Sequence, residues 1–408
     1  MPALGRYCTV FFAGAFQRCG IRAAALPPAD EFMLKEGRGQ CSCKECLPLQ
    51  TCMGSFMDYL GRRPKDEVSA YFMASAEGPC RFGQYHVFFQ RFIETQQIPN
   101  AAILSLNSVN GYGGVGTRFT VAGWRSIVIG DLFAEMHATL SAGAVDPEGA
   151  LRMLDEECAG VSACIQENES AILAQLGEAA RRLSRIPLKA PYAQLPKISL
   201  IGEIYVRHDP ISLQGLIETL ANQGFVVRTA PVSEWILYTD WLTRKGLEGK
   251  RSLDWWIRYG AKRWIDRRIR KALAPSGLIH ETHGLDVGSI VEKGRNFIPE
   301  RLTGETILTV GAAFHDMFDP ACGVISIGPF GCMPSRIAEA VLYETFRTSI
   351  YRQVSGGNGH VPKWLEPEDR KLPFLSIETD GNPFPQLIEA RLEAFCLQAR
   401  RLHERMIR

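Results

Sequence analysis

The stretch that decides the fold is KISLIGEIYV (197–206), together with SLQGLIETLANQG (212–224) and FVVRTA (225–230), which follow it. The first segment is a continuous apolar run, which is typical of a strand buried on both faces of a parallel sheet. The second places leucines at helical spacing and predicts a helix that stops at Gly224, and the third predicts the next strand. Strand, helix and strand at this spacing indicate a βαβ unit.

Further apolar runs with strand character lie on both sides of this unit. Two precede it, separated by helical patterns such as VFFQRFIETQ (87–96), and two follow it, each leading into a loop and then a helix. Because strands alternate with helices, we expect mostly parallel sheets. The four runs are VSAYFMA (68–74), AAILSL (101–106), GVISI (323–327) and PFLSIET (373–379).

A proline-rich segment, PLKAPYAQLPK (187–197), is the clearest boundary in the chain. Proline disfavours helix at and before its own position, so this segment is expected to be an extended linker. A chain of 408 residues also exceeds what one hydrophobic core usually serves. The sequence therefore predicts two Rossmann-like or flavodoxin-like α/β domains, at 1–190 and 197–408. Ligands of open parallel sheets bind at the carboxyl ends of the strands.

Composition narrows the class of protein. Lys and Arg number 46 and Asp and Glu number 44, a formal net charge of +2, which excludes a globally basic nucleic-acid binder. No apolar run reaches the ~20 residues of a membrane span, and the N-terminus lacks the pattern of a secretory signal. We therefore expect a cytoplasmic protein. Its 12 cysteines are too few for a disulfide scaffold and favour metal or redox chemistry.

Three cysteines lie in predicted loops that share nearby proline or glycine residues. Cys46 is followed by Leu-Pro, Cys80 stands in EGPCRFG after the strand at 68–74, and Cys332 stands in GPFGCMP after the strand at 323–327. Glycine and proline turn the chain sharply and bring backbone N–H groups close to whatever the sulfur binds. Iron–sulfur clusters are held by thiolates on such loops. Three thiolates from two domains would hold a [4Fe–4S] cube in the interdomain cleft and leave the fourth iron open.

Two other interpretations of the cysteines stay open at this point. Free cysteine often serves as a small buried hydrophobe. Cys322, just ahead of the run 323–327, is expected to be a strand-end residue. Cys43-x-x-Cys46 has the spacing of a zinc knuckle, although no second pair follows at the usual interval. The cysteines in apolar or helical surroundings are Cys8, Cys19, Cys158, Cys164 and Cys396.

Several segments spread along almost the whole chain carry a family resemblance. They are GRYCTVFFAGAFQRCGIRAAALP (5–27), CKECLPLQTCMGSFMDYL (43–60), YFMASAEGPCRFGQYHVF (71–88), NSVNGYGG (107–114), IGEIYVRHDPIS (201–212), PVSEWILY (231–238), IGPFGCMPSRIAEA (327–340) and PFLSIETDGNPFPQLIEARLEAF (373–395). Together they resemble the 2-hydroxyacyl-CoA dehydratase-like, acyl-CoA dehydratase activase-related iron–sulfur proteins. Relatives of that family include 2-hydroxyglutaryl-CoA dehydratase and benzoyl-CoA reductase subunits.

The resemblance implies a cofactor and a set of ligands. Cys46, Cys80 and Cys332 match the loops from which that family takes its cluster cysteines, and two α/β domains would enclose the cluster. A related group carries a double-cubane [8Fe–9S] cluster on six cysteines and reduces small molecules. Here the six would be those three together with Cys41, Cys43 and Cys322.

The resemblance also implies partners and a reaction. The sequence has no GxxxxGK[ST] loop and no ATPase module ahead of the matching region, so ATP hydrolysis would fall to a separate activator of actin-like ATPase fold. The chain would accept low-potential electrons from that activator and pass them to a substrate, a CoA thioester, for radical dehydration or reduction. We expect an oxygen-sensitive protein in a homo- or hetero-oligomer that binds neither nucleic acid nor a membrane. The alternatives are a non-catalytic iron–sulfur electron-transfer or assembly partner and a zinc-stabilised structural protein.

Remaining motifs are weaker. The run 111–116 formally matches GxGxxG, but a loop near the cleft explains it better than a nucleotide site, since Asp131 falls within a helical pattern. The segment 244–271 holds eleven basic and three acidic residues, and as a helix it would turn an apolar stripe with Trp256, Trp264, Ile265 and Ile269 toward the body. Candidates for acid–base chemistry, cluster contacts or helix capping are His208, Asp209, the HETH loop at 280–283, Arg81, Arg336 and ETDGN at 378–382.

Overall fold

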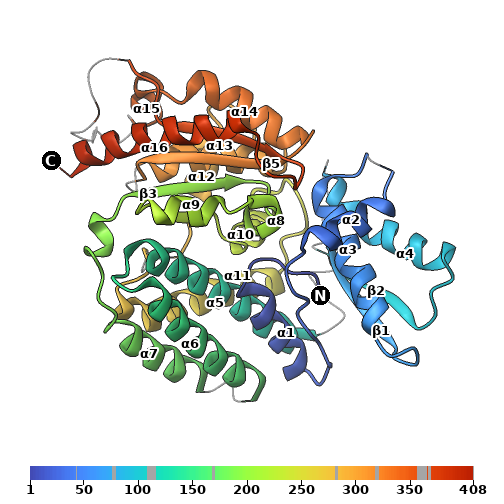
Figure 1. Cartoon of the computed structure of the whole chain (residues 1–408). Helices are drawn as coiled ribbons and strands as arrows, with labels where there is room; N and C mark the ends of the chain where they lie inside the picture. Colours follow the sequence, from blue (N-terminus) through green and yellow to red (C-terminus); the bar gives the residue numbers. More distant parts are fainter. Residues whose placement is uncertain are drawn as a thin grey trace.

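The computed structural model describes residues 1–42, 44–75, 80–107, 116–167, 171–280, 284–317, 321–355, 365 and 369–407. Within them the chain forms a mixed α/β structure with two parallel sheets, one of two strands and one of four. The expectation of an α/β fold with parallel sheets is confirmed. A small lobe, residues 31–107, carries the two-stranded sheet and lies beside the ends of the larger sheet's strands (Figure 1). We call the rest of the described chain the main body.

The four-stranded sheet has the order β4 (Val226–Thr229), β3 (Lys197–Gly202), β5 (Gly323–Pro329), β6 (Phe374–Thr379), all parallel. Every residue of β3 and β5 is buried, as their unbroken apolar sequence predicts. β3 is shorter than the apolar run at 197–206, because the chain turns at Gly202. Gly202 has φ +115°, a conformation that L side chains rarely adopt.

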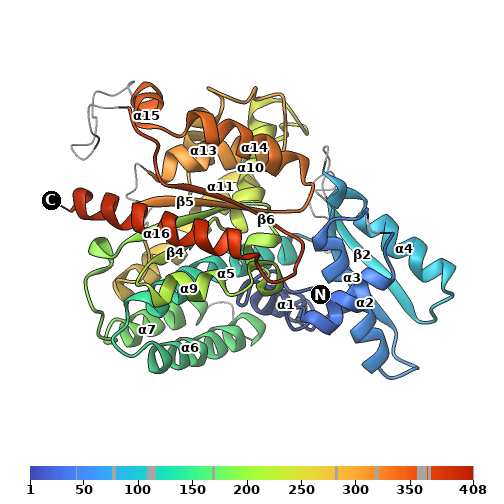
Figure 2. The same ribbon diagram turned by 45° about the horizontal axis from the view of Figure 1, so that its top comes forward.

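Helices cover both faces of this sheet. In Figure 2, α9 (Leu216–Asn222) and α16 (Gln386–Met406) lie on one face, and α13 (Glu305–Asp316) and α14 (Met333–Thr345) lie on the other. From β3 the chain passes through α9 on one face to reach β4, which lies on one side of β3. It then passes through α13 on the other face to reach β5, which lies on the other side of β3. The neighbours β3 and β5 thus form a topological switch point, at whose carboxyl edge ligands of such sheets bind.

The helix expected at 212–224 is interrupted. It is divided into α8 (Pro210–Leu213) and α9, because Gln214 and Gly215 both adopt left-handed backbone angles, with φ of 47° and 72°. Glycine adopts this conformation at little cost, whereas it is uncommon for a residue such as glutamine. Gly224 also has positive φ just after α9, which confirms the predicted stop.

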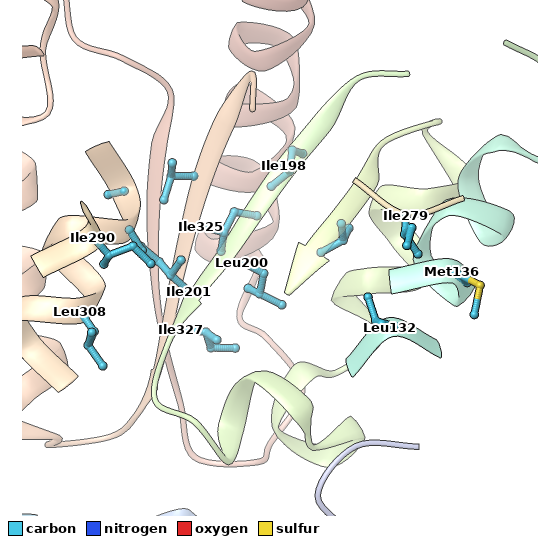
Figure 3. Close-up of a cluster of buried hydrophobic side chains, with 14 of the residues drawn as sticks. Leu132, Met136, Ile198, Leu200, Ile201, Ile279, Ile290, Leu308, Ile325 and Ile327 are labelled. Carbon is cyan, nitrogen blue, oxygen red and sulfur yellow. The ribbon is translucent and has the colours of Figure 1, made fainter. Parts of the chain in front are cut away.

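A layer of long helices packs beneath the sheet. These helices share one hydrophobic cluster with β3, β4 and β5, although four of them precede the proline-rich segment 187–197. Figure 3 shows Leu132 and Met136 of one helix on one side of the strands, with Ile290 and Leu308 on the other. The domain division between 190 and 197 stays a prediction. The helices are α1 (Cys8–Arg18), α5 (Gly116–Gly143), α6 (Pro147–Glu167), α7 (Ile172–Leu183) and α11 (Leu253–Leu273).

The small lobe has a different construction. Its strands β1 (Ser69–Ser75) and β2 (Ala101–Asn107) pair over seven residues, with an aromatic cluster that includes Phe56, Tyr71 and Phe89. The other elements are α2 (Glu31–Gly39), α3 (Leu47–Arg62) and α4 (Tyr85–Thr95). Glycines let α2 and α3 touch backbone to backbone, since a Cβ at Gly37 or Gly54 would overlap a carbonyl of the other helix.

The remaining elements belong to the main body, apart from one 3₁₀ turn that precedes α4. They are α10 (Ser233–Lys245), α12 (Val287–Gly294), α15 (Thr348–Ser355) and the 3₁₀ turns at Arg81–Gln84, Tyr192–Gln194, Val206–His208 and Ala274–Ser276.

Candidate functional site

The three predicted ligand cysteines have the same local structure. Cys46, Cys80 and Cys332 each have extended backbone angles, and each directly precedes a helical segment. Cys46 precedes α3 and Cys332 precedes α14. Both helices have a proline in the first turn, where the N–H group that proline lacks would have no partner within the helix. Cys80 precedes the 3₁₀ turn that leads into α4. Unsatisfied N–H groups and the helix dipole at such positions favour negative charge, as on a thiolate.

Each cysteine backbone is held by local hydrogen bonds. The carbonyl of Cys46 accepts from Leu49 N at 3.0 Å, and that of Cys332 accepts from Arg336 N at 2.9 Å. Cys332 N in turn donates to Pro329 O, the last residue of β5, at 3.0 Å. The sulfur of Cys332 is therefore fixed to the carboxyl end of the central strand by a loop of two residues.

Two glutamates, the buried Glu203 and the half-buried Glu305, face these cysteines from the main body. Glu203 directly follows β3, and its N–H donates to Ile327 O of β5 at 3.0 Å, so that it lies at the switch point. Its carboxylate accepts from Val206 N at 2.8 Å and from Tyr205 N at 3.1 Å. Glu305 is the first residue of α13, and its carboxylate accepts from Ile204 N at 3.0 Å.

The glutamates link the three cysteines electrostatically. The charge of Glu203 acts on the thiols of Cys46, Cys80 and Cys332, and the charge of Glu305 acts on the last two. Cys46 and Cys80 also act on each other. The structure therefore gathers the three predicted ligands around one pair of carboxylates, with two thiols from the small lobe and one from the main body.

The pKa values at this site are all raised. Burial, followed by the charge of Glu203, raises the pKa of Glu305. Crowding by protein and then the charge of Glu305 raise the pKa of the Cys80 thiol to about 12, although that residue is exposed on one side. Burial raises the pKa of Cys332 to about 11. Without a cation beside them, these thiols stay protonated at neutral pH.

Cys46 has a further partner that the sequence did not indicate. Its sulfur is hydrogen-bonded to the hydroxyl of Tyr85, the first residue of α4. Burial raises the pKa of Cys46, whereas this hydrogen bond lowers it.

Among the described residues, no three His, Cys, Asp or Glu side chains are grouped so that they could hold a single metal ion.

Among the other described cysteines, Cys52 of α3 is buried close to this site, because the charges of Cys46 and Glu203 act on its thiol. Cys322 precedes β5 and is buried in the main cluster, with its sulfur 3.1 Å from Lys197 O. A strand of seven residues at ~3.3 Å per residue separates it from Cys332, so the two lie at opposite ends of β5. Cys41 is half-buried beside the small-lobe cluster, and Cys43 lies outside the described residues. The zinc-knuckle spacing therefore stays a prediction. Cys8, Cys158 and Cys396 are buried and Cys19 and Cys164 half-buried.

The histidine and aspartate candidates have local structural roles. His208 Nε2 lies 3.1 Å from Ala230 O, and burial lowers its pKa to about 3. The Asp209 carboxylate caps α8 by accepting from Ser212 N at 3.1 Å. Asp131 lies within α5, as expected, and accepts from Val232 N and Ser233 N at 2.9 Å each. In the HETH loop, 281–283 lie outside the described residues, as do 111–115 of the glycine-rich run.

The remaining candidates join loops around the site. Arg81 donates to Lys44 O, which connects the Cys80 turn to the segment before Cys46. Arg336 pairs with Glu339 at 2.6 Å, and Glu378 accepts from Gly331 N at 2.9 Å beside Cys332. In the loop after β6, Asp380 and Asn382 accept hydrogen bonds from Arg38 of α2.

Sequence reasoning missed Glu203, Glu305 and Tyr85. The signal for Glu203 was present, because it is the one acidic residue inside the apolar run 197–206 and stands where the strand ends. Glu305 and Tyr85 give no such signal, since their roles arise from contacts between distant segments.

Neither a scan against models of protein families nor a search of curated proteins finds a match to this chain. In the part of the chain that the structure describes, no helix is both long enough and apolar enough to cross a membrane.

Proposed function

We propose that this chain binds a [4Fe–4S] cluster through Cys46, Cys80 and Cys332, at the carboxyl edge of the four-stranded sheet. The observation that supports this best is the convergence of three cysteines, each preceding a helical segment, on one pair of carboxylates. A cubane takes each thiolate on a different iron, so its ligands are spread wider than those of one ion. A cluster site therefore does not require three ligands that are close enough together to hold a single metal ion.

The residues around the cysteines suit an anionic cofactor. Helix N-termini at Cys46 and Cys332 place N–H groups and positive dipole ends beside the sulfurs. The raised pKa of Glu305 favours its neutral form, which would reduce the negative charge that a cluster meets. The hydroxyl of Tyr85 would keep its hydrogen bond to the Cys46 sulfur, and such bonds tune the reduction potentials of clusters.

The proposed activity follows from this cofactor and from the family resemblance. A bound cluster with an open iron supplies one-electron chemistry, which would take a CoA thioester toward a ketyl radical for dehydration or reduction. The chain would receive its electrons from a separate ATP-dependent activator of actin-like ATPase fold. We expect it to be a dehydratase-like lyase or reductase component.

Metal content is the first test. The chain is purified without oxygen, and iron, acid-labile sulfide and zinc are counted per chain. About four iron atoms, lost in Cys46→Ala, Cys80→Ala and Cys332→Ala but kept in the half-buried control Cys19→Ala, would support the proposal. Circular dichroism and amide hydrogen exchange check that each variant is folded, because all seven tryptophans lie outside the small lobe that carries Cys46 and Cys80. Zinc in place of iron, or no metal after anaerobic reconstitution, would rule the cluster out.

The same count addresses the double cubane. About eight iron atoms per chain would indicate an [8Fe–9S] cluster. The structure gives this alternative little support, because Cys322 lies at the far end of β5 from Cys332.

Substrate binding separates an enzyme from an electron carrier. Calorimetry with a CoA thioester on the iron-loaded chain is expected to show binding that free CoA fragments without the thioester do not reproduce. Iron without any thioester binding would leave the chain as an electron-transfer or assembly partner.

A further inference from the structure

The basic segment 244–271 folds differently from the sequence expectation. It is not one helix, because it is divided between the end of α10 and α11. Ile265 and Ile269 are buried against the body, as expected. The prediction was wrong for the two tryptophans, because Trp256 and Trp264 are on the exposed side of α11.

The exposed side of α11 has an apolar centre. Leu253 is 79% exposed, Ile257 63% and Trp264 56%. At 3.6 residues per turn, their directions fall within about 40° of one another around the helix, so they form a line about 17 Å long. Trp256, which is 47% exposed, lies beside this line. Single exposed apolar residues are common, but a contiguous patch of them marks an interaction site.

Cations flank the apolar line on both sides. Arg267 and Arg268 are exposed, and they stand about 60° to one side and about 40° to the other side of Trp264 around the helix. Further exposed cations, just before the helix and in its last turn, are Lys250, Arg251 and Lys271.

The acidic residues of α11 do not balance these cations. The helix contains two of them, Asp254 and Asp266. Asp254 pairs with Arg258 at 2.9 Å, and Asp266 is buried and pairs with Arg270 at 2.9 Å. The exposed side of α11 is therefore positively charged, with an apolar centre.

This pattern is typical of a helix that lies on an anionic membrane. In such helices Trp, Leu and Ile enter the boundary between headgroups and acyl chains, while Lys and Arg extend to the lipid phosphates. Indole rings are enriched at this depth, because their N–H groups reach the headgroups while their rings stay apolar. A flat lipid surface also requires no groove in the protein, which suits side chains that protrude from a single helix.

Other occupants fit the exposed side less well. Interfaces between folded proteins carry about one hydrogen bond per 100–200 Å². Apart from the two indoles, the exposed residues from 253 to 264 offer one polar side chain, Asp254, which already pairs with Arg258. Single-stranded nucleic acid would stack its bases on tryptophan. The guanidinium of Arg268, 4.7 Å from the ring centre, occupies one face of Trp264.

We propose that the exposed side of α11 binds the surface of a membrane that contains anionic lipids. Leu253, Ile257 and Trp264 enter the headgroup boundary, and Arg267 and Arg268 contact the lipid phosphates and carboxylates. The proposal departs from the sequence expectation that the chain binds no membrane, since a helix that lies on a membrane needs no spanning segment. It does not depend on the cluster.

Vesicle flotation of the whole chain is the first experiment. The chain is mixed with vesicles of phosphatidylcholine alone, or of phosphatidylcholine with about one third phosphatidylserine. We expect it to float with the anionic vesicles and not with the neutral ones. Flotation should weaken as salt is added, because salt screens the attraction between exposed cations and the lipid headgroups.

The cations are tested by the double variant Arg267→Gln with Arg268→Gln. Partitioning into anionic vesicles should fall about thirtyfold, because each basic residue near such a surface strengthens binding about fivefold. The matched control is Arg62→Gln with Arg91→Gln, which removes the same charge from exposed positions of the small lobe. It should leave partitioning within about twofold of the parent chain.

The apolar line is tested without a change in charge. Leu253→Ser with Ile257→Ser should lower partitioning into anionic vesicles at least about tenfold, because less apolar area leaves water. Leu387→Ser with Leu397→Ser, at exposed positions of α16, is the matched control and should bind as the parent chain does. Circular dichroism checks that α11 is retained in every variant.

Three results would overturn the proposal. They are a chain that does not float with anionic vesicles at low salt, equal flotation with neutral and anionic vesicles, and α11 variants that bind as the parent does. A chain that ignores vesicles but binds a single-stranded oligonucleotide or polyglutamate through the same residues would assign the surface to that partner instead. Chains with and without iron are both floated, so failure of membrane binding and failure of the cluster are distinguishable.

Discussion

The two sheets of this protein differ in how they are buried and in what they carry. β5 of the four-stranded sheet is buried at all seven positions, whereas burial along β1 of the two-stranded sheet alternates. Two parallel strands are marginal on their own, and β1 and β2 rely on α3 and α4 together with residues of α1 and α5. Yet the small lobe supplies two of the three gathered cysteines. The comparison teaches that the more stable sheet fixes the site's position while the less stable lobe completes it.

The tryptophan residues report on the main body and not on the small lobe. All seven tryptophans lie outside residues 31–107. Tryptophan fluorescence therefore follows unfolding of the main body, and amide hydrogen exchange is needed to follow the small lobe.

The largest expected effect is that of Phe314→Ala in the main body. Phe314 is fully buried in α13, stacked on Phe297 at 5.0 Å and packed edge-on against Phe346 at 5.4 Å. The cavity should lower the free energy of unfolding by about 3–5 kcal/mol, measured by denaturant titration of tryptophan fluorescence. An unchanged midpoint would mean that this cluster does not determine the stability of the main body.

The matched change in the small lobe is Phe89→Ala. Phe89 is also fully buried and lies 5.4 Å from both Phe56 and Tyr71. The local cost is again about 3–5 kcal/mol. We expect the tryptophan midpoint to move less than in Phe314→Ala, while amides of β1 and α4 exchange faster. Equal shifts in both variants would show that the two regions unfold as one unit.

A pH dependence is expected from Asp131 in α5. Burial raises its pKa from 3.8 to about 6 in the folded chain, despite hydrogen bonds from Ser233 and Val232 that favour the charged form. The protonated form therefore contributes stability that is present below pH 4 and lost as pH rises through about 6. The effect is on the order of 2 kcal/mol. Stability curves of the parent chain and Asp131→Asn should differ in slope between pH 4 and 7, and parallel curves would contradict this.

The smallest effect is expected at the contact between α2 and the loop after β6. Arg38 donates to Asp380 O and, at 3.3 Å, to Asn382 Oδ1, both at the surface. Arg38→Ala should cost about 1 kcal/mol or less and leave the tryptophan transition in place. Faster hydrogen exchange in α2 alone would show that this contact restrains the lobe, and Arg38→Lys should recover part of the protection.

The strands were predictable because the apolar pattern of a buried strand is contained in a few consecutive residues. The runs at 197–206, 225–230 and 373–379 contain β3, β4 and β6, and the run at 323–327 covers β5 except for its last two residues. Those at 68–74 and 101–106 lie within one residue of β1 and β2. The position of Cys80 and Cys332 shortly after strands was visible for the same reason.

What could not be predicted depends on contacts between distant segments. The break at Gln214 follows from a backbone angle that leucine spacing does not reveal. The exposure of Trp256 and Trp264 depends on which face of α11 meets the body. That Glu305 is turned toward Cys80 and Cys332 appears only once α13 is packed against β3.

The order of residues in the site has a consequence for biosynthesis. The small lobe, with Cys46 and Cys80, is complete by residue 107, whereas β5 and Cys332 are made more than two hundred residues later. At ~5–20 residues per second, the ribosome needs on the order of ten seconds or more to supply the third thiol. During that interval the nascent chain presents two thiols without Cys332 beside them, and Glu203 and Glu305 are added only as the interval proceeds. Under the proposed ligation, cofactor insertion has to follow translation, and the early lobe is the part that a chaperone or thiol reductant would need to protect.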